Sequence, residues 1–269
     1  MKILITGYLG FIGSHAYKHF SKENDVVGID QHDPFPRDKF DLVIHLGANS
    51  STTEKNIESI MRTNYDYSMT LLQRCQRTQT PLIYASSASV YGKTTTFSEG
   101  VSCRPDSPYA WTKYLFDRHV LGEYWDKAPV QGLRFFNVYG PGEEHKGAQA
   151  SVFSKFPKEA KEQGTIKLFE NSDKIYRDFI HVNDVVSVID KFVSVKKSGI
   201  WNVGTGSAES FQAVGEAFSK KYNVPITEIA MPSNMESQYQ YFTESNNTKL
   251  LRTIGNYKFT NPIEWIEQQ

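Results

Sequence analysis

The sequence predicts an α/β fold in which helices cover both faces of a parallel sheet. Apolar runs rich in β-branched residues occur at 2–6, 25–29, 41–46, 81–86 and 132–138. Because these runs are nearly continuous and do not alternate with polar residues, they indicate strands that are buried on both faces. Helical patterns at 56–76 and 107–125 lie between the later strands, and this alternation is typical of a doubly wound sheet.

A smaller α+β lobe is expected after about residue 140. The alternation ends in YGPGEEHKGAQAS, and the following patterns indicate a helix at about 151–163, a strand near 165–169 and a helix after GTGSAES. We expect the sheet domain to comprise residues 1–140 together with about 180–206, and the second lobe to comprise residues 141–179 together with 207–269. Substrate-binding lobes are often built in this way.

The composition favours a globular protein without a nucleic-acid or membrane partner. The 269 residues suffice for a hydrophobic core, and 30 basic residues balance 30 acidic ones. No run approaches the roughly 18 apolar residues that span a bilayer, and the opening MKILITG is too short for a signal peptide. Cys75 and Cys103 lack metal-ligand spacing, so we expect no metal site and a cytoplasmic location.

A glycine-rich turn joins the first strand to the first helix. In ITGYLGFIGSH, Gly7 permits the tight turn, Gly10 lets the backbone approach a pyrophosphate, and Gly13 lets the helix pack on the strand. The free N–H groups at the start of the helix would then bind the phosphates. Asp30 ends the second strand, where a carboxylate can accept hydrogen bonds from the adenine-side ribose. The pattern predicts a Rossmann-like dinucleotide site. The alternatives are a glycine turn without a ligand and a plain turn residue at 30.

Three further residues complete a known order of motifs. Ser87 lies in YASSASVYG at the end of the fourth apolar run, and YAWTK places Tyr109 one helical turn before Lys113. Taken alone, Ser87 is a turn former and Tyr109 a core aromatic. Together with the glycine loop they resemble the short-chain dehydrogenase/reductase superfamily, in its extended branch of nucleotide-sugar epimerases and dehydratases. The resemblance implies that Tyr109 is the acid–base group, with Lys113 beside it and Ser87 on the substrate oxygen.

A tyrosine base needs electrostatic help at neutral pH. A free phenol has a pKa near 10, so the phenolate requires about 3 units, or about 4 kcal/mol, of preferential stabilisation. The ammonium group of Lys113 and the positive charge of the nicotinamide are the expected sources.

Longer blocks resemble the ADP-glycero-manno-heptose 6-epimerase family. These blocks are HLGANSSTTE (45–54), FFNVYGPGEEHKGAQAS (135–151), KLFENSDKIYRDF (167–179), GTGSAESFQAV (204–214) and YQYFTESN (239–246). The resemblance implies transient oxidation of C6″ with bound NADP, a place in lipopolysaccharide biosynthesis, and Lys146 as a second base opposite Tyr109. For Lys146 the alternative is an exposed loop lysine. For the protein, the alternatives are a UDP- or GDP-hexose 4-epimerase, or a non-catalytic dinucleotide sensor or assembly subunit.

The resemblance also implies which residues bind the two ligands, and it implies a homo-oligomer. The cofactor residues would be Gly7, Tyr8, Leu9, Gly10, Phe11, Ile12, Gly13, Asp30, Gln31, Leu46, Gly47, Ala48, Asn64, Ala85, Ser86, Tyr109, Lys113, Phe136 and Val138. The nucleotide-sugar residues would be Ser87, Asn137, Lys146, Phe169, Glu170, Ser172, Arg177 and Tyr239. A guanidinium such as that of Arg177 can bind a diphosphate through two hydrogen bonds. The alternative for it is an ion pair with Asp178 or Asp184.

One segment departs from the family pattern. Only ten residues, QHDPFPRDKF, separate Asp30 from Asp41, where the family carries several times as many. A crossover with a helix needs about a dozen residues, whereas ten residues can extend over about 33 to 36 Å. We therefore expect one extended connection and no edge strand beyond the second strand. Pro34 and Phe35 are the predicted substitutes for the missing adenine wall.

Two further expectations concern chemistry. Asp30 would repel a 2′-phosphate and favours NAD, whereas Arg37, Lys39 and the family precedent favour NADP; we expect NAD. Related dehydratases carry Asp-Glu directly after the serine or threonine, and this chain has Ala88 and Ser89 there. The sequence therefore predicts no dehydratase activity.

Overall fold

Six parallel strands form the central sheet, in the order β10-β5-β4-β3-β1-β2. They are β1 (Lys2–Thr6), β2 (Asp25–Ile29), β3 (Leu42–His45), β4 (Leu82–Ser87), β5 (Val130–Phe135) and β10 (Gly199–Val203). The computed structural model describes residues 1–31, 33–51, 54, 56–123, 125, 127–233 and 239–269. All five predicted strands are confirmed. The chain runs outward from β1 to β2 and then crosses back to β3, so the direction of winding switches between β1 and β3.

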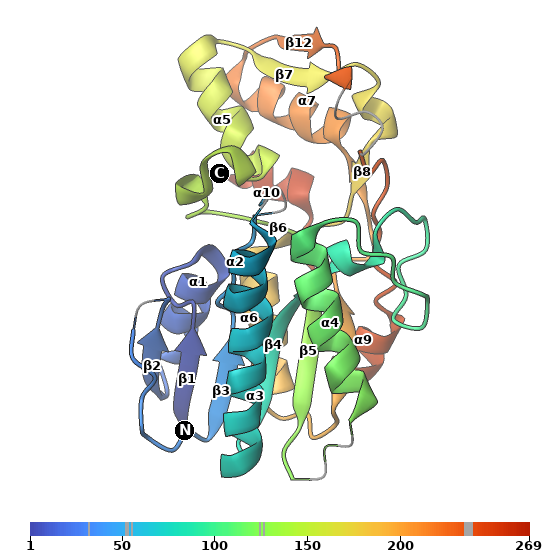
Figure 1. Cartoon of the computed structure of the whole chain (residues 1–269). Coiled ribbons are helices and arrows are strands. Elements are labelled where there is room, and N and C mark those ends of the chain that lie inside the picture. Colours follow the sequence, from blue (N-terminus) through green and yellow to red (C-terminus); the bar gives the residue numbers. More distant parts are fainter. Residues whose placement is uncertain (32, 52–53, 55, 124, 126, 234–238) are drawn as a thin grey trace.

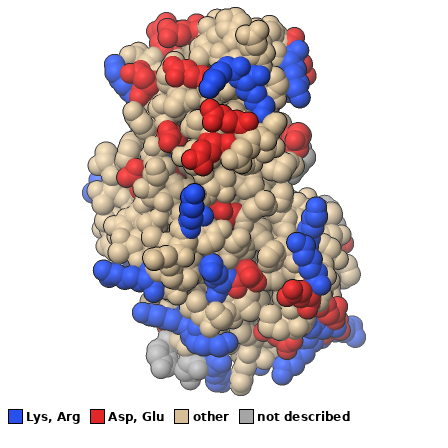
Figure 2. Space-filling model, turned by 180° about the vertical axis from the view of Figure 1, so that it is seen from behind, with Lys and Arg blue, Asp and Glu red and all other residues tan. Residues whose placement is uncertain are grey.

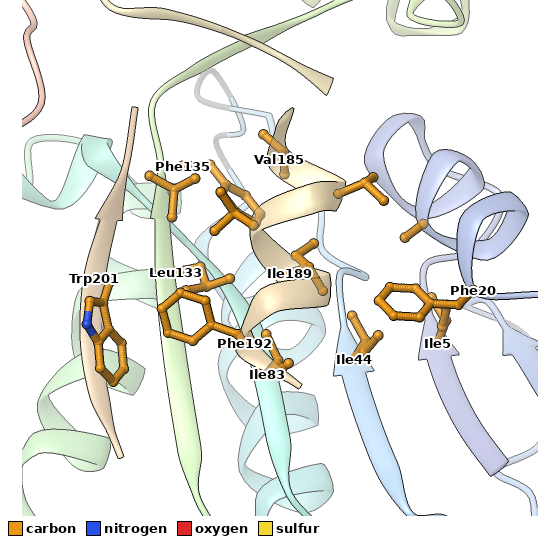
Figure 3. Packing of buried hydrophobic residues seen from close by; sticks show 14 of the residues in the cluster. Ile5, Phe20, Ile44, Ile83, Leu133, Phe135, Val185, Ile189, Phe192 and Trp201 are labelled. Atoms are coloured by element: carbon orange, nitrogen blue, oxygen red, sulfur yellow. The ribbon is translucent and has the colours of Figure 1, made fainter. Parts of the chain in front are cut away.

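Helices cover both faces of this sheet (Figure 1). One face carries α1 (Phe11–Phe20) and α6 (Val182–Phe192); the other carries α2 (Ile57–Met61), the π-helical turn η1 (Arg62–Asp66), α3 (Tyr67–Thr78) and α4 (Pro108–Gly122). Successive residues of each strand supply both cores, because strand side chains alternate between faces. Ile3 and Ile5 of β1 pack towards α1 and α6, whereas Leu4 packs towards α3. Figure 3 shows Ile189 and Phe192 of α6 against Leu133 of the sheet.

The second lobe lies beyond the carboxyl ends of the sheet strands (Figure 1). Its elements are α5 (Val152–Gln163), α7 (Phe211–Tyr222), α10 (Pro262–Gln268), β7 (Ile166–Phe169), β12 (Ile226–Ile229), β8 (Tyr176–Arg177), β11 (Glu209–Ser210) and the single turns η3 (Glu144–Gln149) and η4 (Ser172–Lys174). β7 pairs with β12 and β8 with β11. Phe153 and Phe218 lie in its aromatic core.

One short strand pair, one turn and one late helix lie between the two lobes in the fold. β6 (Asn137–Tyr139) pairs with β9 (Phe179–His181), and the turn η2 (Ala88–Tyr91) follows β4. α9 (Thr248–Ile254) places Leu250 in the core of the sheet domain, although it lies in the part of the chain predicted for the second lobe. The predicted domain boundaries stay a prediction.

The edge strand expected to be absent is absent from the described sheet, where β2 pairs with β1 alone. The short connection after Asp30 instead runs back along the sheet to its amino end. There Asp38 pairs with Lys2 at 2.7 Å, and the Asp41 N–H donates to the Lys2 carbonyl oxygen. Figure 2 shows basic and acidic side chains interspersed over the back of the molecule. None of the described helices has the length and apolar character of a bilayer span.

Phe35 has a different place from the one predicted. The centre of its ring lies 4.1 Å from Cζ of the Arg74 guanidinium on α3, and the ring packs on the cluster that contains Phe40 and Val43. Arg74 also donates to the Pro36 carbonyl oxygen. Phe35 therefore covers the sheet face under α3, where a crossover helix would otherwise pack, and this contact supplies no adenine wall.

Replacing Phe35 by Ala should lower the free energy of unfolding by about 1 to 3 kcal/mol, because a partly buried aromatic ring loses its contacts. Chemical denaturation measures this change, and Pro34→Ala, at an exposed neighbouring position, is the matched control. If Phe35→Ala keeps its stability but binds dinucleotide more weakly, Phe35 contacts the adenine as the sequence predicts.

Candidate active site

Glycines allow two backbones to touch at the switch point between β1 and β3. Gly7 has φ of +72°, and a Cβ there would lie 2.5 Å from the Cα of Gly47. A Cβ on Gly13 would lie 1.9 Å from the carbonyl oxygen of Gly7. Gly10 is the N-cap residue of α1 and has no side chain to cap the helix. The free N–H groups of the helix N-terminus are therefore available to an anion.

Asp30 lies directly beside this glycine loop. Its carboxylate accepts hydrogen bonds from the N–H of Leu9 at 3.2 Å and from that of Gln31 at 2.8 Å. Its own N–H donates to Asp33 at 2.8 Å. The carboxylate is therefore held at the carboxyl end of β2, where the sequence places it.

A buried chain of hydrogen bonds runs beneath the loop. The Gly47 N–H donates to Oγ1 of Thr6 at 3.3 Å, and this oxygen lies 2.6 Å from Nδ1 of His45. Nε2 of His45 lies 2.8 Å from Oγ of Ser68, which donates its hydrogen to the Asn64 carbonyl oxygen. Nε2 must therefore donate, and in the neutral imidazole Nδ1 then accepts from Thr6. Burial lowers the pKa of His45 to about 3.

Asn64, a predicted cofactor residue, uses its amide within the protein. Its Oδ1 accepts from the Asn49 N–H at 2.8 Å, while Nδ2 donates to the Asn49 carbonyl oxygen at 2.9 Å and to Thr112 at 3.2 Å. The residue lies in η1, and π-helical turns are frequent at functional sites. These bonds hold the loop after β3 against α4.

Ser87, Tyr109 and Lys113 come together at the carboxyl edge of the sheet. Ser107 caps α4 by accepting from the Ala110 N–H at 3.2 Å, which places Tyr109 in the first turn. The Tyr109 phenol lies near the side chain of Ser87. Oγ of Ser87 accepts hydrogen bonds from the N–H and the hydroxyl of Ser89, at 3.2 and 2.9 Å. Nζ of Lys113 lies 5.9 Å from the centre of the Tyr109 ring and donates to the Ala85 carbonyl oxygen at 2.9 Å.

The protein groups alone leave this phenol protonated at neutral pH. Burial raises the pKa of Tyr109, and the nearby hydroxyl of Ser87 only opposes that rise. Burial lowers the pKa of Lys113 to about 8, although the negative charge of Asp117 acts to raise it. A further positive charge is therefore required before Tyr109 can act as a base, and a nicotinium ring would fit this need.

A buried ion pair supports the catalytic helix. Asp117 of α4 lies 2.8 Å from Nε of Arg134 on β5, and the two side chains are 0% and 3% exposed. The hydroxyls of Tyr84 and Ser86 each donate to Asp117 at 2.9 Å. Ser86, another predicted cofactor residue, thus points into this network.

The other predicted cofactor residues divide into exposed and packed groups. Leu9 is 66% exposed at the tip of the glycine loop, Gln31 is exposed, and Ala48 is half-buried. The packed side chains, which contact the cores of the sheet domain or the small aromatic cluster near η2, are those of Tyr8, Ile12, Leu46, Ala85, Phe136 and Val138.

Lys146 lies over the first residue of α1. Its Nζ is 4.0 Å from the centre of the Phe11 ring and 3.5 Å from the carboxylate of Glu143. Glu143 is buried and accepts from both the N–H and the hydroxyl of Ser151. Burial lowers the pKa of Lys146, and Glu143 opposes this effect. The amine is thus held beside the glycine loop in a half-buried position.

Arg177 is a buried cation at the second lobe. Its guanidinium lies 5.3 Å from the centre of the Tyr239 ring and 5.5 Å from that of Phe211. Burial lowers its pKa. Within the described part of the chain it makes no salt bridge.

The alternative partners of Arg177 bond elsewhere. Asp178 accepts from the backbone of Thr205, Gly206 and Ser245. Asp184 accepts from the Tyr257 hydroxyl and the Thr260 N–H, so neither carboxylate is directed to the guanidinium.

The remaining substrate residues differ in availability. Phe169 makes an edge contact with Tyr239 at 6.2 Å, and Glu170 and Asn137 are exposed. Ser172 is 3% exposed and donates to Gln212 of α7 at 2.6 Å. Its hydroxyl therefore supports the loop from within.

Arg37 and Lys39 lie far along the sheet from the glycine loop. With Arg74 and Arg77 they line a cavity of about 560 Å³ at the end of α3. Asp38 between them pairs with Lys2, at the amino end of β1, whereas Asp30 lies at the carboxyl end of β2. The two cations are not placed to neutralise a 2′-phosphate beside Asp30.

Comparisons with known proteins agree with this geometry. Residues 3–204 match the model of the NAD dependent epimerase/dehydratase family. The structure is similar to ADP-L-glycero-D-manno-heptose-6-epimerase from Helicobacter pylori, with a TM-score of 0.90 and 28% identity over 99% of this chain and 94% of that one. It is similar to MoeE5 in complex with UDP-glucose and NAD, with a TM-score of 0.85 and 25% identity over 100% and 97% of the two chains. UDP-N-acetylglucosamine 4-epimerase from Methanobrevibacter ruminantium M1 shares the fold, with a TM-score of 0.87 and 21% identity over 99% and 95%.

The neutral, buried His45 should make stability fall with acid. Below about pH 6.5 the unfolded chain binds a proton that the native imidazole, with its pKa of about 3, does not bind. The resulting loss is about 1.4 kcal/mol per pH unit down to that pKa. Denaturation at pH 6, 5 and 4 should therefore show a steeper decline for the natural protein than for His45→Gln. Equal slopes would mean that His45 takes up a proton in the native state.

Proposed function

Because the chain belongs to the NAD dependent epimerase/dehydratase family, we propose that it is a nucleotide-sugar epimerase acting by transient oxidation of one sugar carbon. The observation that carries the proposal is the meeting of Ser87, Tyr109 and Lys113 at the same carboxyl edge of the sheet as the glycine loop. The glycine loop and Asp30 would hold NAD, which would supply reversible hydride transfer at that carbon.

The protein's own groups manage the proton. Tyr109 takes the proton of the sugar hydroxyl as the carbonyl forms. As the carbonyl is reduced, its oxygen receives a proton from Tyr109 if one base serves both transfers, and from Lys146 if two bases do. Ser87, whose side chain lies near the Tyr109 phenol, holds the sugar oxygen. Lys113, fixed to the Ala85 carbonyl oxygen, adds positive charge near the phenol. No proton is gained or lost over the full cycle.

The position of Lys146 favours inversion at C6″ of an ADP-linked manno-heptose. In a 6-epimerase the oxidised carbon lies outside the ring, so two bases can serve its two orientations while the ring shifts. The half-buried amine of Lys146 beside α1 suits the second base. A 4-epimerase of a UDP- or GDP-hexose, which turns the keto sugar over a single base, is the second candidate.

Arg177 is proposed to bind the diphosphate of the substrate. A buried guanidinium without a carboxylate partner is costly, and an anionic ligand would offset this cost. The nearby rings of Tyr239 and Phe169 supply apolar surface for the nucleotide.

NAD is the proposed cofactor in preference to NADP. Asp30 lies beside the glycine loop, and the cations that could accept a 2′-phosphate lie at the other edge of the sheet. An epimerase should retain its dinucleotide in the oxidised form, whereas a non-catalytic sensor need not. The homo-oligomeric state and the cytoplasmic location stay predictions from the sequence, as does the absence of dehydratase activity.

Tyr109→Phe and Lys146→Met should each slow epimerisation of ADP-manno-heptose by about 10²- to 10⁴-fold, the usual contribution of a positioned acid or base. Lys158→Met, an exposed lysine on α5, is the control for loss of a charge. Full activity of Lys146→Met, or turnover of hexose nucleotides alone, would replace the C6″ assignment by a single-base 4-epimerase.

Arg177→Met should weaken binding of a nucleoside diphosphate by about 1.5 to 3 kcal/mol, the contribution of a hydrogen bond to a charged group. Calorimetry with ADP and UDP measures this loss. The free energy of unfolding should not fall, because the variant removes an unpaired buried charge. Arg118→Met, at an exposed position of α4, is the control. Unchanged ADP and UDP affinity would remove Arg177 from the diphosphate site.

A further inference from the structure

The short connection after Asp30 leaves the adenine side of the dinucleotide site to be closed by another part of the chain. Phe35 does not close it, because its ring lies under Arg74 on the sheet face. The residues that do lie at this edge come from the ends of β1, β2 and β3 and from the start of α3.

Tyr67 is the aromatic residue that α3 presents there. It is the first residue of the helix, and it is 37% exposed. Its ring lies against the imidazole of His45, with centres 5.8 Å apart and planes inclined by 44°. His45 ends β3 and is held by Thr6 on one nitrogen and Ser68 on the other. The Tyr67 ring therefore rests on a fixed support with much of its surface uncovered.

Tyr67 also shares the carboxyl edge of the sheet with Asp30, the residue that should bind the adenosine ribose. His45, which supports the Tyr67 ring, pairs in register with Thr6, and Thr6 pairs with Ile29, the residue before Asp30. Burial and the charge of Asp30 both raise the pKa of Tyr67, so its hydroxyl keeps its proton. Asp30 in turn accepts from the Leu9 N–H, and Leu9 is 66% exposed. An anionic carboxylate, an exposed leucine and a partly exposed phenol thus lie along one edge of the sheet, at the ends of β2, β1 and β3. Apolar faces next to a carboxylate suit a purine nucleoside.

We propose that Tyr67 forms the adenine-side wall of the dinucleotide site, with its ring against the adenosine and its hydroxyl directed to the ribose hydroxyls beside Asp30. The inference rests on the proposed function only in requiring that a dinucleotide binds at the glycine loop. It gives this chain a wall built from the helix after β3, in place of the missing segment after β2.

The test is calorimetry with ADP-ribose, which carries the adenine half of the dinucleotide without the nicotinamide. Tyr67→Ala should bind ADP-ribose about 10- to 100-fold more weakly, the usual loss for an aromatic ring that stacks on a base. Tyr67→Phe keeps the ring and should lose no more than about threefold. Tyr67→Leu keeps an apolar, helix-compatible side chain. Its affinity for ADP-ribose replaces that of Tyr67→Ala in the test if Tyr67→Ala is unstable. Tyr222→Ala, a half-buried tyrosine of the second lobe, is the control.

ADP-ribose affinity that is unchanged in both Tyr67→Ala and Tyr67→Leu would overturn the wall, as would a natural protein that does not bind ADP-ribose. The outcome is separable from the proposed reaction. A natural protein that binds ADP-ribose but epimerises no nucleotide sugar would refute the epimerase and leave the role of Tyr67 standing.

Discussion

Backbone meets backbone where β1 and β3 end, and the geometry of the site follows from that contact. The Cα of Gly47 occupies the space that a side chain on Gly7 would need, while the two strands stay paired from Ile3 to Thr6. Because all six strands are parallel, this contact between two glycines lies at the same edge of the sheet as Ser87 and the first turn of α4. The proposed phosphate site and the proposed acid–base pair therefore lie on the same edge without any loop having to reach across the molecule.

Buried polar groups then fix the elements that carry the chemistry. Asp117 and Arg134 tie α4 to β5, and a buried pair of this kind adds more to position than to stability. Asp117 also opposes the tendency of burial to discharge Lys113, one turn earlier. On the other side of the switch point, His45 joins β1 to α3 as a neutral link. Both connections lie under the site and keep its groups in place before a ligand arrives.

The sequence predicted the features that depend on local pattern. Continuous apolar runs located the strands, and the glycine spacing located the loop, because each follows from a few adjacent residues. Contacts between distant parts of the chain could not be predicted from the sequence. Phe35 lies in a segment without periodicity, and its partner Arg74 is on a later helix. Ser172 matches a family position, yet its hydroxyl bonds to Gln212, 40 residues away. Tyr67 is one more helical aromatic in the sequence, and its packing on His45 becomes apparent only in the structure.

The ten-residue connection after β2 also bears on how the chain folds. The central pair of β1 and β3 joins Ile3 to Leu42, a separation of 39 positions (42 − 3). The entropy lost on closing a loop grows with its length, and each doubling adds about 0.6 kcal/mol. Without an inserted strand and helix, the contacts between β1 and β3 are therefore more local than a longer crossover would allow. Low contact order of this kind favours rapid folding. The short connection after β2 thus leaves the adenine side of the proposed site less covered, and it also favours formation of the sheet that carries the site.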